Sequence, residues 1–178
     1  MPVHAWRLIA ISTLAVAGAD ALHAQAPVGV RLPGYLSAVR LDSGTVAASI
    51  PASPGAVFWA ARQIFSEFKI PTPEADSARG YLVNRRFIKL RSLAGSPLST
   101  FLNCGTGITG PNADAFRVTM AIGAFIEPAG PTASRLRLNL VAGAESTEGA
   151  SKSAVACAST GVLEERLARL IRTRAARP

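Results

Sequence analysis

The pattern of apolar and polar positions is clearest between residues 53 and 69. Apolar side chains recur there every three or four positions, the spacing of one face of an α-helix. These side chains are Val57, Ala61, Ile64, Phe65 and Phe68. Ser53 is suited to accept a hydrogen bond from an amide of the first turn, and Pro54 suits the first helical position. The pattern predicts an amphipathic helix that needs an apolar surface to cover its stripe.

Strand patterns occur on both sides of this helix. The candidate strands span residues 45–50, 80–88, 115–126 and 134–142. The last two show the clearest alternation, with a Pro and Gly turn between them, so they predict a hairpin with one apolar and one basic face. The alternation in 80–88 is imperfect, and it leaves open which face of that strand is buried.

A second amphipathic helix is expected at the end of the chain. Its stripe consists of Leu163, Leu167, Leu170 and Ile171. Acidic residues fall in its first turn and arginines toward its end, as the helix dipole favours. The element order strand, helix, strand, strand, strand, helix predicts an α+β fold. In it, a mostly antiparallel four-stranded sheet carries two helices on one face.

The first residues are typical of a secretory signal. Arg7 lies before an apolar core over 8–19, and small residues follow at 22–26, with cleavage expected after Ala24. An uncleaved anchor is the alternative. This division gives a signal peptide at 1–24, a flexible leader at 25–43 and a single α+β domain at 44–178. We expect a periplasmic or secreted protein with no stable transmembrane segment after cleavage and, without a cysteine near the exit, no lipid anchor.

Export would remove both histidines, His4 and His23. The remaining chain would then lack imidazole, which excludes histidine-activated nucleophiles and histidine metal sites. We therefore predict no enzyme, no catalytic residue, no metal and no cofactor. The formal net charge of +8 favours anionic partners such as acidic protein, anionic lipid or lipopolysaccharide. Export argues against nucleic acid.

Two cysteines, Cys104 and Cys157, are present. An even pair in an exported chain predicts a disulfide, with two buried thiols as the alternative. The sequence of residues 105–110 matches the dinucleotide-binding pattern G-x-G-x-x-G. That pattern requires a preceding strand and a following helix. The flanking residues supply neither, so we expect a glycine-rich turn shaped around Cys104.

Basic residues cluster on the polar face of the predicted hairpin. Arg117, Arg135 and Arg137 share this face, and Arg85 is placed to join them. Such a surface suits phosphate or carboxylate groups, and a solvated sheet face is the alternative. Trp59 does not fit the apolar stripe of its helix. It is expected either to lie beneath another segment, such as 27–50, or to form part of a contact surface.

The stretch 49–58, Ser-Ile-Pro-Ala-Ser-Pro-Gly-Ala-Val-Phe, resembles the strand-to-helix entry of helix-grip domains. The element order over 45–175 is similar to that of BamC-like envelope accessory domains. The resemblance implies a helix-grip fold and a role in the envelope. The expected function is an exported, non-enzymatic protein that binds an envelope protein or an anionic envelope component. The alternatives are a small helix-grip carrier of an apolar ligand and a purely structural accessory.

Overall fold

A computed structural model of the chain describes residues 28–43, 46–147 and 153–177. Within them, seven antiparallel strands form one sheet, in the order β4-β5-β11-β12-β13-β8, with β3 also paired to β12. These strands are β3 (Val46–Ile50), β4 (Glu74–Asp76), β5 (Tyr81–Leu90), β8 (Leu102–Asn103), β11 (Arg117–Gly130), β12 (Ala133–Glu145) and β13 (Ala154–Ser159). The long β11–β12 hairpin forms the centre of the sheet.

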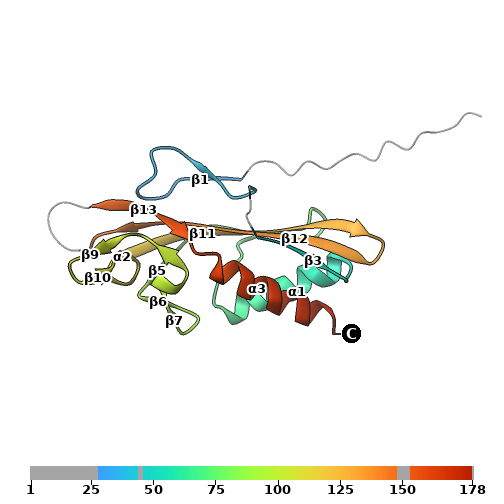
Figure 1. Cartoon of the computed structure of the whole chain (residues 1–178). Helices are drawn as coiled ribbons and strands as arrows, with labels where there is room; N and C mark the ends of the chain where they lie inside the picture. Colours follow the sequence, from blue (N-terminus) through green and yellow to red (C-terminus); the bar gives the residue numbers. More distant parts are fainter. Residues whose placement is uncertain (1–27, 44–45, 148–152, 178) are drawn as a thin grey trace, which may run out of the picture.

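Two long helices cover one face of the sheet (Figure 1). They are α1 (Pro54–Glu67) and α3 (Val162–Ala175), and both were predicted from their apolar stripes. The side chain of Ser53 accepts from the amide of Ala56 at 3.4 Å, so the predicted cap of α1 is confirmed. At the start of α3, the hydroxyl of Ser159 accepts from the amide of Gly161.

The predicted four-stranded sheet with two helices is wrong. The described residues form seven strands in the main sheet and three α-helices, the third being the short α2 (Asn112–Ala115). The predicted strands correspond to β3, β5, β11 and β12. The additional strands β4, β8 and β13 have three, two and six residues. β4 and β8 are too short for a readable alternation, and β13 (Ala-Val-Ala-Cys-Ala-Ser) consists mainly of small residues without an apolar–polar alternation. Their pairing partners define all three as strands.

An irregularity in β5 explains its imperfect alternation. Met120 pairs with Phe87, but Ile122 pairs with Asn84, so Arg85 and Arg86 together face one residue of β11. This extra residue is a β-bulge. The bulge shifts the alternation by one position, so that Leu82 before the bulge and Phe87 after it both supply side chains to the same core, although they are five positions apart. The buried side chains of β5 therefore do not belong to a single alternating set, and no regular strand pattern could have predicted which ones face the core.

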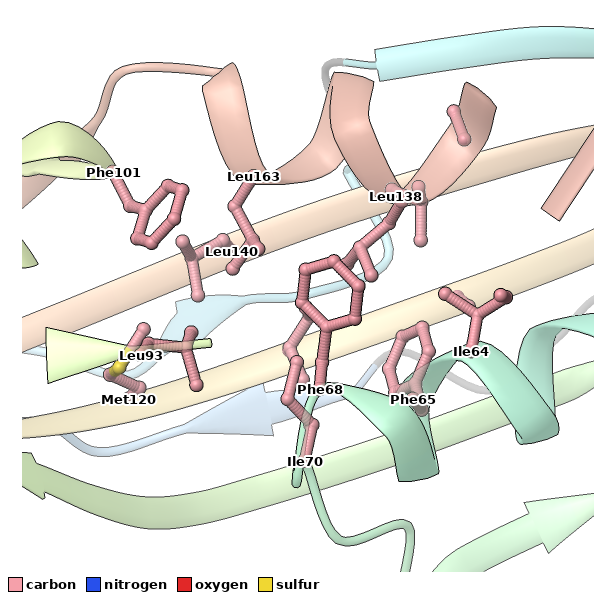
Figure 2. Packing of buried hydrophobic residues seen from close by; sticks show 14 of the residues in the cluster. Ile64, Phe65, Phe68, Ile70, Leu93, Phe101, Met120, Leu138, Leu140 and Leu163 are labelled. Atoms are coloured by element: carbon pink, nitrogen blue, oxygen red, sulfur yellow. The ribbon is translucent and has the colours of Figure 1, made fainter. Parts of the chain in front are cut away.

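The main core lies between the sheet and the two long helices. Figure 2 shows Ile64 and Phe65 of α1, and Phe68 directly after it, pointing toward the sheet. They meet Leu138 and Leu140 of β12, and Leu163 of α3 lies beside them. Burial of each large apolar side chain contributes roughly 1.5–3 kcal/mol, so this contact is a principal source of stability. The helical stripes predicted from the sequence are therefore the surfaces that the sheet covers.

The segment from 91 to 113, expected to be a surface excursion, also contributes to this core. It contains the small hairpins β6 (Ser92–Leu93) with β7 (Ser96–Pro97) and β9 (Thr106–Gly107) with β10 (Gly110–Pro111), and the 3-10 turn η1 (Leu98–Thr100). Of its large apolar side chains, Ile108 is exposed, whereas Leu93, Leu98, Phe101 and Leu102 are buried. The Gly and Ser residues of this segment shape turns that bring these side chains under the sheet.

The second face of the sheet carries residues 28–43, which we call the strap (Figure 1). The strap contains β1 (Gly29–Val30) paired with β2 (Val39–Arg40). Val30, Leu32 and Leu41 of the strap are buried in a second apolar cluster. The sheet contributes Val83, Ala121 and Phe125 to the same cluster. Instead of the flexible leader expected over 25–43, the described part is a packed layer, because this face of the sheet is partly apolar.

Candidate functional site

Polar side chains of β12 fix the strap to the sheet. Arg137 donates to the backbone oxygen of Asp42 at 2.6 Å and to the carboxylate of Glu127 at 2.6 Å. Its guanidinium also lies over the ring of Phe125. The amide of Asn139, which is buried, donates to the backbone oxygen of Leu41 at 3.1 Å. Arg137 is therefore occupied with contacts inside the protein.

The predicted basic face of the hairpin is largely neutralised by glutamates. Arg117 pairs with Glu145 at 3.1 Å, and Arg85 pairs with Glu74 at 2.7 Å. With Arg137 bound to Glu127, three of the four predicted arginines have an acidic partner. Arg135 is exposed and has no ion pair among the described residues. The structure therefore retains one free cation from the predicted set.

Trp59 lies on the outer surface of α1, with 55% of its surface exposed. Its ring meets the ring of Phe58 edge to face at 5.6 Å, and the guanidinium of Arg62 lies over it at 5.4 Å from the centroid. Neither of these contacts comes from residues 27–50, the segment that would cover Trp59 in the first of the two expected alternatives. The indole is thus an exposed aromatic beside a cation.

The strongest concentration of positive charge lies on the helices and not on the hairpin. We call the outer surface of 54–69 and 162–177 the helix layer. Its seven basic side chains are Arg62, Lys69, Arg166, Arg169, Arg172, Arg174 and Arg177. Against them stand two exposed acidic side chains, Glu67 and Glu165. Seven positive and two exposed negative side chains give this surface a net charge of +5. When the buried Glu164 is counted as well, as it is in the formal +8 of the whole chain, the two segments carry +4, half of that total.

Three of these arginines have contacts inside the layer, one of them being Arg62 over the ring of Trp59. Arg174 donates to Gln63 at 2.8 Å and to Glu67 at 2.7 Å, so it joins the two helices. Arg166 lies over the ring of Phe68 at 5.2 Å. In contrast, Arg169 and Arg172 are exposed, and within the described part of the chain neither has an ion-pair partner. Their charges are available to a ligand.

Glu164, in the first turn of α3, is fully buried. One carboxylate oxygen accepts from the hydroxyl of Ser159 at 2.7 Å, and the other has no partner among the described residues. Burial raises the pKa of Glu164, while the Ser159 hydroxyl and the backbone of Leu140 act in the opposite direction. Sequence reasoning placed Glu164 among the first-turn acids that the helix dipole favours and did not predict its burial. Its helical position between Leu163 and Leu167 was the available signal.

The predicted disulfide between Cys104 and Cys157 is confirmed. It joins the turn after β8 to β13, and the strap contacts the same place because the hydroxyl of Tyr35 donates to the backbone oxygen of Cys157 at 3.0 Å. Burial raises the pKa of Tyr35. Both sulfurs are thus held in a structural link.

The glycine-rich stretch 105–110 forms the β9–β10 hairpin. Asn112, which follows it, donates from its side chain to the backbone oxygen of Cys104 at 3.1 Å and from its amide to that of Gly105 at 3.0 Å. The helix that begins there, α2, has only four residues. As predicted, the stretch forms a turn next to Cys104, and the two-residue β8 before it and the four-residue α2 after it are not the long strand and helix of a dinucleotide site.

Further comparisons give no family for this chain. Among the residues that the structure describes, no group of three His, Cys, Asp or Glu side chains is arranged to hold a metal ion. In the same residues, no helix combines the length and apolar character needed to cross a membrane. Comparison with protein-family models, curated proteins and solved structures found no match.

Proposed function

We propose that this chain is an exported, non-enzymatic binding protein whose helix layer holds an anionic component of the cell envelope. The observation that carries the proposal is the net charge of +5 on the helix layer, with Arg169 and Arg172 exposed and without ion pairs there. The disulfide is compatible with export, because disulfides persist in oxidising compartments. The proposal keeps the anionic partner expected from the sequence and places its binding surface on the helices.

The exposed Trp59 supports the same surface. Tryptophan is enriched at membrane–water interfaces, where its ring is apolar and its N–H meets polar groups. Basic residues near an anionic lipid surface contribute about 1 kcal/mol each. A helix layer with several free arginines and one exposed indole therefore has both the charge and the aromatic group that such a surface favours.

The test is binding to lipid vesicles of defined charge. Vesicles of phosphatidylglycerol and phosphatidylcholine are compared with phosphatidylcholine alone by co-sedimentation. In the chain that signal cleavage would leave, Trp59 is the only tryptophan, so its fluorescence reports directly on the helix layer. We expect binding to the anionic vesicles, a blue shift of the fluorescence, and weaker binding as salt is raised.

Charge reversal locates the surface. Arg169→Glu with Arg172→Glu should weaken vesicle binding about thirtyfold or more, given about 1 kcal/mol for each basic residue. The matched control is Arg31→Glu with Arg91→Glu, which makes the same change of net charge at exposed positions outside the helix layer. Equal losses in the two variants would show that binding depends on net charge alone and would overturn the assignment to the helices.

The alternative function, an apolar-ligand carrier, gains no support from the core. The space between sheet and helices is filled by packed side chains, among them Phe65, Phe68 and Leu140 (Figure 2). A carrier of the helix-grip type needs room for its ligand in that space. Native mass spectrometry of protein taken from its own envelope would detect such a ligand, and the carrier stays a prediction.

A further inference from the structure

The edge strand β3 has a free side. It pairs with β12 from Val46↔Leu138 to Ile50↔Ser134, and no other described strand pairs with it. Alternate residues of an antiparallel edge strand direct their N–H and C=O groups away from the sheet. The side chains of Ala47 and Ser49 are exposed, while Ala48 and Ile50 are buried beneath the helices. The strand is thus held firmly on one side and open on the other.

The opposite edge of the sheet is protected, and β3 is not. The edge strand β4 has three residues, of which Glu74 and Asp76 are charged. Short length and charge are the usual devices that prevent an edge from pairing with another chain. β3 has five residues, none of them charged and none of them proline. The two edges of one sheet therefore differ in the feature that decides whether a further strand is accepted.

A free cation lies next to this open edge. Arg135 of β12 is the direct partner of Ser49 and shares its face of the sheet. Arg135 is also the one predicted hairpin arginine without an ion pair in the described chain. A strand added to β3 would lie two strand spacings, about 10 Å, from β12. Ser49 is short, so Arg135 can extend over it toward a carboxylate on the added strand.

We propose that β3 is a strand-addition site for an extended, acidic segment of a partner protein. The backbone of the segment would continue the sheet, as in other cases of β-augmentation. Its acidic side chains would lie on the face of Arg135, and the alternating apolar side chains on the face of Val46 and Ala48. A second copy of this chain fits less well, because β3 has no carboxylate to offer the partner's arginine.

This site is separate from the helix layer, and its test uses the backbone of β3 as the reporter. The probe is a blocked seven-residue peptide that alternates glutamate and valine, titrated to millimolar concentration into the ¹⁵N-labelled chain. We expect amide chemical shifts to change at Val46–Ile50 and across β12. The peptide in which lysine replaces glutamate, and a peptide with four glutamates followed by three valines, should leave these amides unmoved.

Two substitutions test the contact with Arg135. Arg135→Gln should weaken the glutamate–valine peptide about two- to fivefold, the effect of an exposed ion pair. Ser49→Asp should weaken it further by repulsion, whereas the uncharged Ser49→Asn is the matched control and should not. Both positions of change, Ser49 and Arg135, are exposed, and a dispersed spectrum verifies the fold of each of the three variants.

Several outcomes would overturn the strand-addition site. Chemical-shift changes confined to α1 and α3 would mean that the peptide binds only to the helix layer, through its negative charge, and not to β3. Equal effects of the glutamate and lysine peptides would remove the role of Arg135. Shifts at β3 that depend on protein concentration without peptide would identify a second copy as the occupant. By contrast, if the chain bound the peptide but did not bind anionic vesicles, the proposed function of the helix layer would be contradicted and the strand-addition site would be supported.

Discussion

Ser159 donates its hydroxyl to one oxygen of the Glu164 carboxylate at 2.7 Å, while the other oxygen of that buried group has no partner among the described residues. β3 covers β12 up to Leu138, and β13 covers it from Ala142. The residues between them have no partner strand on that side among the described residues. The carboxylate of Glu164 lies near the backbone of Leu140 in this interval, where that backbone influences its pKa.

Glu164 should make stability depend on pH. Burial raises its pKa in the folded chain, so the folded state binds the proton more tightly than the unfolded state. This contribution to stability is fully present below the unfolded pKa of about 4.3 and is lost as pH rises through the folded value. As pH falls from 7.5 toward 4.5, the free energy of unfolding of the wild type should therefore rise relative to that of the Glu164→Gln variant. The expected change in this difference is about 1–3 kcal/mol.

Urea denaturation at a series of pH values measures this difference. The comparison between wild type and variant matters, because Asp42, whose pKa is lowered by its bond to Arg40, acts in the opposite sense in both proteins. Glu165→Gln makes the same chemical change at the exposed neighbouring position. If Glu164→Gln and Glu165→Gln followed the same pH profile, the buried carboxylate would not be the cause.

Arg137 should hold the strap in place. Replacement by methionine keeps much of the apolar stem but removes the bonds to Asp42 and Glu127. A bond to a charged group contributes about 1.5–3 kcal/mol, and partial exposure reduces this value. We expect a loss of about 1–3 kcal/mol and faster hydrogen exchange at residues 28–43. Arg135→Met, two residues away and free of such bonds, should leave both quantities unchanged; a similar effect there would contradict the role of Arg137.

The disulfide should contribute strongly to stability. Cys104 and Cys157 are 53 residues apart in the sequence. Closing a loop of that size lowers the conformational entropy of the unfolded chain and so stabilises the folded state by roughly 3–4 kcal/mol. We expect Cys104→Ser with Cys157→Ser to lower the free energy of unfolding by about that amount. The measurement is urea denaturation with and without reductant. Reductant should destabilise the wild type and leave the variant unaffected, and an effect of reductant on both would point to another cause.

Long periodic elements could be predicted from the sequence, because their packing is written in one stretch of residues. The disulfide could be predicted for another reason, because the sequence contains two cysteines and no others. The stripe of α1 and the alternation of β11 and β12 satisfy the condition of lying in one stretch. The strap does not. Val28, Val30 and Leu32 alternate over only five residues, and their partner Phe125 lies on the hairpin face expected to be basic. Recognising one surface required recognising the other.

The binding surfaces illustrate a second limit. The sequence shows that Arg117 and Arg137 share a face. Whether their charges are free depends on Glu145 and Glu127, which the strand register places beside them and which form ion pairs with them. A one-residue bulge at Arg85 and Arg86 shifts the register between β5 and β11, and no local sequence pattern shows this shift. The free charges are therefore those left after pairing, and pairing is a property of the folded sheet.

Gly34 should be intolerant of any side chain, because the strap passes directly against β13 there. Its φ is +79°, and a Cβ atom at this position would overlap the backbone of Val155 and Ala156. Gly95 has the same φ of +79° with open space around it. Gly95→Ala thus incurs only the backbone strain of a left-handed residue, about 1–3 kcal/mol, whereas Gly34→Ala must also displace the strap from β13.

The comparison of the two alanine variants separates strain from packing. We expect Gly34→Ala to lower the free energy of unfolding by more than Gly95→Ala. It should also expose residues 28–43 to limited proteolysis, because the bond from Tyr35 to Cys157 would be lost with the displaced strap. Gly95→Ala should leave the strap protected. Equal destabilisation with an intact strap in both variants would mean that the left-handed conformation, and not the approach to β13, is what requires glycine at position 34.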